Sequence, residues 1–229
     1  MNTIPVLNVS SIRKEWISPG REPLVVLKNV NLQIEAGTST AIVGPSGSGK
    51  STLLSILAGL DTPTTGSVFL NGVNISIMNE SNLAEYRGKN LSIVFQQFHL
   101  MPSLTAIENV SLPLEIRGDS HATELAKDAL RSVGLEERMT HLPKELSGGE
   151  CQRVAIARAI VTKPSLLLAD EPSGNLDPET GEQITNLLFK IAHENKMTML
   201  LVTHNMDLAA RCQQTYVMKK GELTRVQAP

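Results

Sequence analysis

The stretch Gly44–Thr52 reads GPSGSGKST and decides the fold of the chain. It matches the phosphate-binding loop pattern GxxxxGK[ST]. A β-rich run, STAIVG at residues 39–44, precedes it, and an apolar run, STLLSILAGL at residues 51–60, follows it. These flanks predict a strand, a loop and then a helix, which is the context in which the pattern binds phosphate. A dinucleotide-binding GxGxxG motif is a poor competitor, because Thr52 stands where its third glycine would be.

Each residue type in this loop has a chemical reason to be there. Gly47 and Gly49 let the backbone curl so that its N–H groups face a β-phosphate. Lys50 places a positive charge between the β- and γ-phosphates, and the Ser51 hydroxyl is a ligand for Mg²⁺. We therefore expect ATP and Mg²⁺ as cofactors. The nucleotide contacts predicted from the loop are Gly44, Pro45, Ser46, Gly47, Ser48, Gly49, Lys50, Ser51 and Thr52. The alternative, a Gly/Ser-rich connector, leaves the agreement of strand, spacing and helix unexplained.

Two more apolar runs predict strands that are buried on both faces. They are SLLLAD at residues 165–170 and TMLLVTH at residues 198–204. Between them, apolar residues from Ile184 to Ile191 recur at i, i+3, i+4 and i+7, which indicates an amphipathic crossover helix. The resulting βαβ unit predicts an α/β fold with a parallel sheet.

Other segments predict additions to this core within one domain over residues 1–229. Alternation around Asn71-Gly72 in TTGSVFLNGVNI predicts a tight hairpin, and hence an antiparallel β subdomain beside the parallel sheet. From about Phe98 to Thr162 the strand signals fade. HATELAKDALRSVGL at residues 121–135 and the run after LSGGE are both helix-like. We expect an inserted α-helical subdomain over about residues 98–162.

Polar residues follow each predicted strand of the sheet. Asp170 and Glu171 end SLLLAD, which places two carboxylates at the ligand-binding edge of such a fold. Asp170 would hold Mg²⁺, directly or through water, and Glu171 would orient and deprotonate an attacking water. A solvated acidic turn is the alternative, which the phosphate loop disfavours. Taken alone, His204 after the third strand is more often a structural cap, and Gln96 after SIVF more often meets only solvent.

Composition limits the classes of partner. The chain has 21 Lys and Arg against 23 Asp and Glu, so it lacks the basic excess of a nucleic-acid binder, and we expect no nucleic-acid partner. No apolar run approaches the roughly 20 residues of a membrane helix, and MNTIPVLNVS lacks the features of a signal peptide, so a cytoplasmic location is expected. Cys151 and Cys212 have no metal-ligand spacing, and reduced, packed thiols are expected rather than a disulfide.

The segment Leu146–Glu150, LSGGE, raises a question that its own residues leave open. Two adjacent glycines stand at the start of a predicted helix, although glycine inside a helix costs about 1 kcal/mol relative to alanine. Ser147 is a good N-cap, and glycine tolerates an irregular helix start. Alternatively, bare N–H groups at a helix N-terminus make an anion site.

Taken in order, GPSGSGKST, VFQQ, LSGGE, LLLADEP, SGNLD and VTH resemble the motifs of the ATP-binding cassette ATPases of ABC transporters. The resemblance covers essentially the whole chain. It implies a RecA-like P-loop NTPase core and an ATPase that converts ATP and water to ADP and phosphate. It also implies a homodimer with ATP at the interface, in which Ser147, Gly148 and Gly149 face the γ-phosphate held by the partner subunit.

The resemblance assigns roles to further residues. Gln96 corresponds to the mobile glutamine that senses Mg²⁺ and adds to the metal ligands Ser51 and Asp170. His204 corresponds to the switch histidine on the γ-phosphate, so that Glu171, His204, Lys50 and Gln96 make up the expected catalytic set. Asp177 corresponds to the aspartate of the loop after the acidic pair. Trp16 stands where the family has an aromatic residue that stacks on adenine, although packing is an alternative for this residue.

Within the family, DEPSGNLD, LAGLDTPTTG, ENVSLPLEIRG and VTHNMDLAARC are most similar to LolD/MacB/YbbA-type ATPases, with YbbA-like proteins nearest. These ATPases serve lipoprotein release, macrolide export and related tasks. The resemblance implies a separate integral-membrane permease as partner, which would hold the ATPase at the inner membrane from the cytoplasmic side. The competing functions are a soluble ABC ATPase acting on a ribosome or DNA and a nucleotide sensor without turnover. The segment LSGGE corresponds to the signature segment of the family. Cys151, directly after it, replaces a usual glutamine, and we expect it to make the signature sensitive to thiol reagents.

Overall fold

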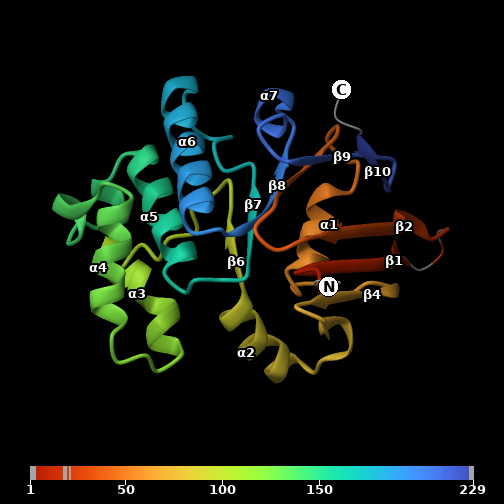
Figure 1. Cartoon of the computed structure of the whole chain (residues 1–229), viewed down its shortest axis with the longest axis horizontal. Coiled ribbons are helices and arrows are strands. Elements are labelled where there is room, and N and C mark those ends of the chain that lie inside the picture. The colour runs from red at the N-terminus through yellow and green to blue at the C-terminus, as the bar shows by residue number, and fades with distance from the viewer. Residues whose placement is uncertain (1–3, 18–19, 21, 227–229) are drawn as a thin grey trace.

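The computed structural model describes residues 4–17, 20 and 22–226, which form a β-rich part and a helical part (Figure 1). The strands are β1 (Leu7–Trp16), β2 (Leu24–Ile34), β3 (Ser39–Val43), β4 (Thr65–Leu70), β5 (Val73–Asn74), β6 (Leu91–Val94), β7 (Leu166–Asp170), β8 (Thr198–Thr203), β9 (Gln214–Lys219) and β10 (Glu222–Val226). The α-helices are α1 (Lys50–Leu57), α2 (Glu80–Asn90), α3 (Ala106–Ile116), α4 (Ala122–Ser132), α5 (Gly148–Ile160), α6 (Pro178–Glu194) and α7 (Met206–Ala209). Short 3₁₀ helices are η1 (Ile75–Ile77), η2 (Glu136–Arg138) and η3 (Pro143–Glu145).

A six-stranded sheet, in the order β10-β9-β3-β8-β7-β6, carries the predicted site residues at one edge. Strands β9, β3, β8, β7 and β6 run parallel, and β10 is antiparallel to β9. Val43 at the end of β3 is opposite Thr203 of β8, and Asp170 at the end of β7 is opposite Val202. The phosphate loop, the acidic pair and His204 therefore leave the sheet side by side, as their positions after predicted strands indicated.

A smaller antiparallel sheet, in the order β2-β1-β4-β5, lies beside the first. Its β4–β5 hairpin pairs Leu70 with Val73. The two residues of the turn, Asn71 and Gly72, have φ of 50° and 78°, as a two-residue hairpin of mirror-image type requires. The predicted hairpin and antiparallel element are confirmed.

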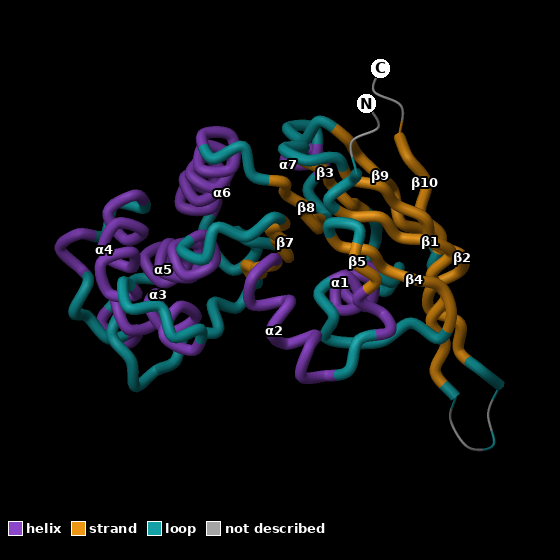
Figure 2. Tube along the Cα trace, turned by 60° about the horizontal axis from the view of Figure 1, so that its bottom comes forward, coloured by secondary structure: helices purple, strands orange, loops and turns teal. Residues whose placement is uncertain are grey.

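The unbroken apolar runs of β7 and β8 are explained by burial on both faces of the large sheet. In β7, Leu166 and Leu168 belong to the core that includes α1 and strands of the smaller sheet. The alternate residues Leu167 and Ala169 belong to the core shared with α3, α4, α5 and α6. Figure 2 shows these four helices grouped on one side of the molecule, away from α1 and the smaller sheet.

Residues 98–162 contain helices α3, α4 and α5 and no strand, in agreement with the loss of strand signals there. The three helices contribute Val110, Leu130 and Val154 to one hydrophobic core. That they form a subdomain of a single domain over residues 1–229 stays a prediction. The longest helix of the described residues is α6 with 17 residues, and no helix there has the length and apolarity needed to cross a bilayer.

Candidate nucleotide site

The phosphate loop joins β3 to α1, and glycine determines its path. Gly47 and Gly49 have φ of 74° and 109°, conformations that side-chain-bearing residues rarely adopt. A Cβ on Gly49 would also lie 2.9 Å from Leu27 Cδ2 and 3.1 Å from the carbonyl oxygen of Val26. The loop is thereby packed against β2. Helix α1 begins at Lys50, one residue earlier than the apolar run predicted.

The Lys50 ammonium group lies within this loop. Its Nζ donates to the carbonyl oxygens of Gly44, at 2.8 Å, and Pro45, at 3.0 Å. In the described part of the chain it has no carboxylate partner within ion-pair distance. The two carbonyl oxygens are neutral acceptors, whereas phosphate oxygens are ionised and add Coulomb attraction to the hydrogen bond with an ammonium group. A triphosphate in the loop would therefore compete effectively for this ammonium group.

A cavity of about 680 Å³ opens in front of the loop and collects most of the predicted catalytic and metal residues. Its walls come from β2, the phosphate loop, α1 and the ends of β6, β7 and β8. The lining residues are Val26, Ser46, Gly47, Gly49, Lys50, Ser51, Thr52, Gln96, Asp170, Glu171 and His204. Residues that are 155 positions apart in sequence, from Gly49 to His204, thus share one cavity.

The Glu171 carboxylate is fixed from three directions. Oε1 accepts a hydrogen bond from the backbone N–H of His204 at 3.0 Å and lies 2.7 Å from Nδ1 of the same histidine. Oε2 accepts one from the Thr203 hydroxyl at 3.4 Å. The residue adopts φ 46°, a strained backbone position of the kind that clusters at functional sites. Glu171 and His204 therefore form one hydrogen-bonded unit at the mouth of the cavity.

The donors available for a metal are oxygen atoms: the Ser51 hydroxyl, the Gln96 amide and the Asp170 carboxylate. Burial raises the pKa of Asp170, and the neighbouring Glu171 raises it further, whereas Lys50 lowers it. Within the described residues, no three His, Cys, Asp or Glu side chains are grouped as a metal cage. This set fits Mg²⁺, which is usually held by one or two carboxylates together with phosphates and waters.

Gln96 is tied to a residue that sequence reasoning did not single out. Its Nε2 donates to Asn175 Oδ1 at 2.9 Å, and Asn175 Nδ2 donates back to the Gln96 carbonyl oxygen at 3.1 Å. A Cβ on Gly174 would lie 2.8 Å from Gln96 Nε2, so the glycine permits this approach. Asn175 lies within SGNLD, and that motif was the available signal. The amide oxygen of Gln96 is left for another ligand.

Contacts within the chain explain why the signature segment, LSGGE, has a serine followed by two glycines. Ser147 is the N-cap of α5: its Oγ accepts from the Glu150 N–H at 3.2 Å, and its own N–H donates to Glu150 Oε2 at 2.8 Å. A Cβ on Gly149 would lie 2.6 Å from Thr180 Cγ2 in α6, and one on Gly148 would lie 3.3 Å from Leu176 Cδ2. The glycines therefore allow α5 to approach α6 of the same chain. Ser147, Gly148 and Gly149 are absent from the lining of the 680 Å³ cavity.

Asp177 and Trp16 are also absent from the lining of this cavity, as are Gly44, Pro45 and Ser48 of the phosphate loop itself. Asp177 is the N-cap of α6, with Oδ1 accepting from the Thr180 N–H at 3.0 Å, and this contact lowers the pKa of its carboxyl. It lines a neighbouring hollow of about 660 Å³ that Glu171 and His204 also reach. Trp16 ends β1 and is 52% exposed, so it is not a core packing residue.

Two further side chains, Gln152 and Arg158, connect α5 to the segment that carries Gln96, and sequence reasoning missed both. Gln152 has no exposed surface and donates from Nε2 to the carbonyl oxygens of Pro172, at 2.7 Å, and Phe95, at 3.3 Å. Arg158 donates to the carbonyl oxygens of Phe98 and His99 at 2.9 and 2.7 Å. The signature helix is thus bonded to the segments after β6 and β7.

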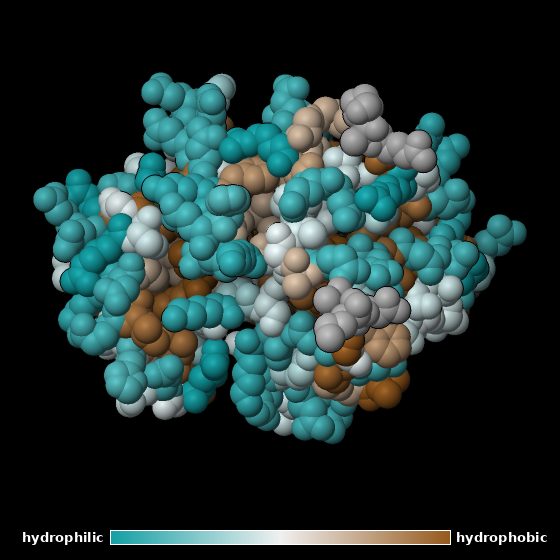
Figure 3. All heavy atoms as spheres, viewed as in Figure 1, coloured by the Kyte–Doolittle hydropathy of each residue, from teal (hydrophilic) through white to brown (hydrophobic). Residues whose placement is uncertain are grey.

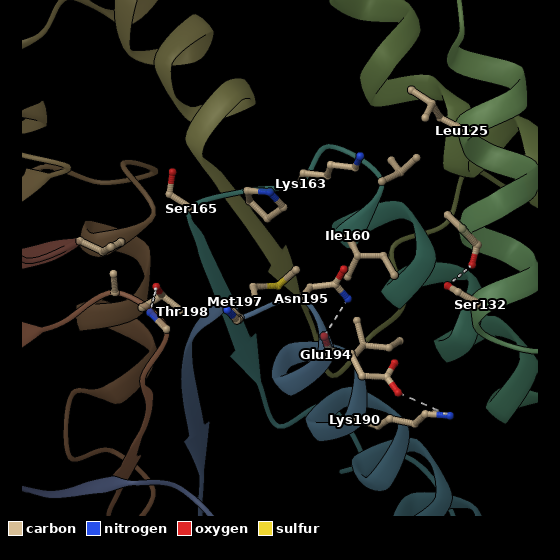
Figure 4. Close-up of a pocket in the computed structure, with 18 of the residues that line it drawn as sticks. Leu125, Ser132, Ile160, Lys163, Ser165, Lys190, Glu194, Asn195, Met197 and Thr198 are labelled. Atoms are coloured by element: carbon tan, nitrogen blue, oxygen red, sulfur yellow. Dashed lines mark hydrogen bonds and ion pairs between the residues drawn. The ribbon is translucent and has the colours of Figure 1, made fainter.

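A larger hollow, about 820 Å³, lies at the opposite ends of β7 and β8, away from the acidic pair. Lys163 and Lys190 line it, but Figure 4 shows them extending in different directions. Lys190 is paired with Glu194 at 3.9 Å. No group of charged side chains converges there, so its size alone does not make it a candidate site.

Most of the residues that form this site lie in a part of the chain that matches a known protein family. The family described as "ABC transporter" matches residues 27–174, a span that contains the phosphate loop, Gln96, the signature segment and the acidic pair. The chain belongs to the ABC transporter family. Its ATPase activity is that of the family's ATP-binding cassette, and the prediction of an ATP-binding, ATP-hydrolysing protein is confirmed.

Two bacterial ABC transporter proteins are similar over nearly their whole length. The ABC transporter ATP-binding protein YbbA of Escherichia coli (strain K12), described as uncharacterized, is 46% identical over 224 residues, covering 96% of this chain and 98% of YbbA. The lipoprotein-releasing system ATP-binding protein LolD of Hahella chejuensis is 45% identical over 225 residues, covering 97% of this chain and 96% of LolD. The predicted YbbA/LolD-like character of the chain is confirmed.

The ABC cassette fold is also matched in three dimensions. The dimeric structure of MJ0796, a bacterial ABC transporter cassette, has a TM-score of 0.87 and 38% identity, covering 97% of this chain and 100% of that chain. A dimeric post-hydrolysis state of MJ0796 bound to ADP and Pi matches with a TM-score of 0.86. The predicted fold, an α/β phosphate-loop core with antiparallel and helical parts, is confirmed.

Proposed function

We propose that this chain is the ATPase subunit of a bacterial ABC transporter that dimerises on ATP and drives a separate integral-membrane permease of the lipoprotein-release or macrolide-export type. The relatives named for lipoprotein release, at about 45% identity, support the first of these two permease types. The dimeric neighbours support a homodimer.

One observation about the site is the main support for the proposed dimer. Lys50, Gln96, Asp170, Glu171 and His204 share a single cavity, whereas the anion-binding start of α5 lies outside it. A helix N-terminus of this kind is suited to bind phosphate. Because the chain holds its own triphosphate site at the phosphate loop, the start of α5 serves the nucleotide of a second copy. ATP is then enclosed between the phosphate loop of one subunit and Ser147–Gly149 of the other.

The reaction follows from the side chains around the cavity. Lys50 and the loop N–H groups bind the β- and γ-phosphates, and Ser51, Asp170 and Gln96 hold Mg²⁺, which neutralises phosphate charge when it is bound. Glu171 accepts a proton from the attacking water, a role that contributes typically ~10²- to 10⁴-fold. His204 contacts the γ-phosphate and, through its Nδ1 contact at 2.7 Å, orients the Glu171 carboxylate.

An exposed apolar surface supports a permease partner. Figure 3 shows a mostly hydrophilic face on which hydrophobic residues gather over the helical part of the molecule, around α3 and α4, and also at lower right, beside the smaller sheet. Ile116 at the end of α3 is 77% exposed, and Met101 before α3 is 49% exposed. Apolar side chains in such a position suit a protein interface. Docking of a permease here would hold the chain at the cytoplasmic side of the inner membrane.

A pair of substitutions at Ser147 tests the shared site. Asn and Asp are both good N-caps, so Ser147→Asn and Ser147→Asp each keep the start of α5 folded. Only Asp places a negative charge where the partner's γ-phosphate is proposed to lie. Size-exclusion chromatography with light scattering, in a Glu171→Gln background that retains ATP, measures the dimer.

We expect Ser147→Asn to dimerise with ATP and Ser147→Asp to stay monomeric, although it binds ATP with unchanged affinity. Equal dimerisation of the two variants would contradict the shared site. The permease is tested separately, by co-purification of the tagged chain with the membrane protein encoded beside it. Recovery of a soluble neighbour instead would contradict the transporter role.

A further inference from the structure

Lys14 is a buried lysine placed beside the predicted adenine-stacking residue. It lies two positions before Trp16 on β1, which has a register shift against β2 directly after Lys14. Lys14 is only 7% exposed, which is rare for lysine unless it is paired. Its Nζ lies over the Trp16 ring, 4.5 Å from the ring centroid.

The ammonium group is fixed by two short contacts. Nζ donates to Asp61 Oδ1 at 2.7 Å and to the Thr62 carbonyl oxygen at 2.7 Å. Asp61 Oδ1 also accepts from the Thr62 N–H at 2.7 Å, which holds the carboxylate in place. An ammonium group has three donors, and after these two contacts one remains toward the indole ring.

The residues that anchor Lys14 belong to the turn after α1, the helix that starts in the phosphate loop. The same turn is bonded to the end of β1. The Thr64 N–H donates to the Arg13 carbonyl oxygen at 2.8 Å, and the Glu15 N–H donates to Thr64 Oγ1 at 3.0 Å. The strand end that presents Trp16 is therefore attached to the phosphate-binding helix.

We propose that Lys14 is a positioning residue that holds the Trp16 ring ready to stack on adenine. The proposal rests on the proposed ATPase function and on the adenine-stacking role that the family resemblance implies for Trp16. A cation over an indole face is attracted by the ring, and here it occupies one face, so that the base would stack on the opposite face. Because the ring is fixed in advance, less side-chain freedom is lost when the base binds.

Trp16 is the only tryptophan of the chain, so the protein's tryptophan fluorescence reports on this ring alone. The test compares Lys14→Met with Lys14→Arg, which keeps a cation. Lys127→Met on α4 is the matched control, because it makes the same chemical change far from the site. Calorimetry measures the affinity for Mg-ATP and for Mg-tripolyphosphate, which lacks the base, and fluorescence anisotropy measures ring mobility.

For Lys14→Met we expect Mg-ATP affinity to fall by about 3- to 10-fold, the range that corresponds to fixing one side chain. We expect Mg-tripolyphosphate affinity to stay unchanged and Trp16 anisotropy to fall. Lys14→Arg should restore ATP affinity to within about twofold of wild type. An equal loss for both ligands would overturn the proposal, since Lys14 would then act through α1 on phosphate binding alone. Unchanged ATP affinity in a variant of lower anisotropy would overturn it as well.

Asp61→Asn supplies a second route if Lys14→Met does not fold. It removes the charged anchor and keeps the lysine, and it should lower ATP affinity selectively by a smaller factor. Trp16→Ala separates this proposal from the stacking role. If that variant loses no ATP affinity relative to tripolyphosphate, stacking itself fails. If it does lose affinity, Lys14→Met should add nothing further in the Trp16→Ala background, and an additive loss would overturn the positioning role.

Discussion

The phosphate loop and the signature segment both place a glycine-rich backbone at the start of a helix, yet they have different surroundings. The loop before α1 faces a cavity that also contains Asp170, Glu171 and His204. The segment before α5 has its cap satisfied by Glu150 and its glycines packed against α6. The same local design therefore gives a nearly complete site in one place and half a site in the other.

This difference is the reason to propose that a second molecule completes the phosphate site at the start of α5. A helix N-terminus that is capped within its own chain still presents N–H groups on its outer side. In the proposed function those groups gain a phosphate partner only from another molecule, because the chain's own triphosphate would bind at Lys50. In the proposed dimer, each subunit contributes one complete set of catalytic residues and one signature segment.

The most severe test of the phosphate-loop side is Glu171→Gln. We expect ATP turnover to fall by at least ~10²-fold, because the carboxylate that accepts the proton is lost. ATP affinity should remain, since Lys50 and the loop are unaltered. Steady-state phosphate release and nucleotide binding measure the two effects. Glu194→Gln, at the far end of α6, is the control, and normal turnover in Glu171→Gln would show that another group acts as the base.

A smaller effect is expected for Gly149→Ala on the signature side. Its Cβ would lie 2.6 Å from Thr180 Cγ2, and overpacking of this kind costs about 1–3 kcal/mol in the free energy of unfolding. Thr180→Ser removes the clashing methyl group and should restore stability in the double variant, whereas Gly148→Ala should cost less. Urea unfolding measures these changes.

The double variant also separates the two roles of Gly149. With stability restored, ATP-driven dimerisation and turnover remain impaired only if Gly149 also faces the partner's γ-phosphate, as the family resemblance implies. Recovery of the dimer would assign this glycine to packing within its own chain alone. Gly149→Asp by itself cannot make this distinction, since a larger side chain meets Thr180 first.

The smallest effect is expected from thiol reagents. The structure argues against the expectation that Cys151 makes the signature sensitive to them, and the expectation itself stays untested. Its thiol is buried in α5, and burial raises its pKa; burial also raises the pKa of Cys212 to about 11. At pH 8 about one Cys212 in a thousand is therefore thiolate, the reactive form.

We expect iodoacetamide at pH 7 to leave turnover unchanged and to label both cysteines far more slowly than in urea. Labelling of Cys212 in the folded chain should rise about tenfold per pH unit up to pH near 11, because its thiolate fraction does. Mass spectrometry over time follows both sites. Rapid labelling of Cys151 at pH 7, with loss of turnover, would show that the start of α5 opens in solution.

The sequence by itself determined the phosphate loop, the buried strands and the βαβ order. Local spacing and apolar runs are enough for this, because the apolar character of a strand and the positions of glycines in a loop can be seen within a few neighbouring residues. They also placed Asp170, Glu171 and His204 at one edge, since the carboxyl ends of parallel strands meet there. Ser147 was recognisable as a cap from its residue type alone.

Only the tertiary structure decided which residues are partners across long sequence distances. The Gln152 contacts to Phe95 and Pro172 and the Lys14 contacts to Asp61 and Thr62 have no periodic or motif signal. SGNLD drew attention to the segment of Asn175, but it did not indicate Gln96 as the partner of that residue. The reason for Gly149 was also hidden, because Thr180 lies on another helix. Hydrogen bonds and close approaches between separate elements depend on how the two sheets and the helices pack, and no local pattern records that packing.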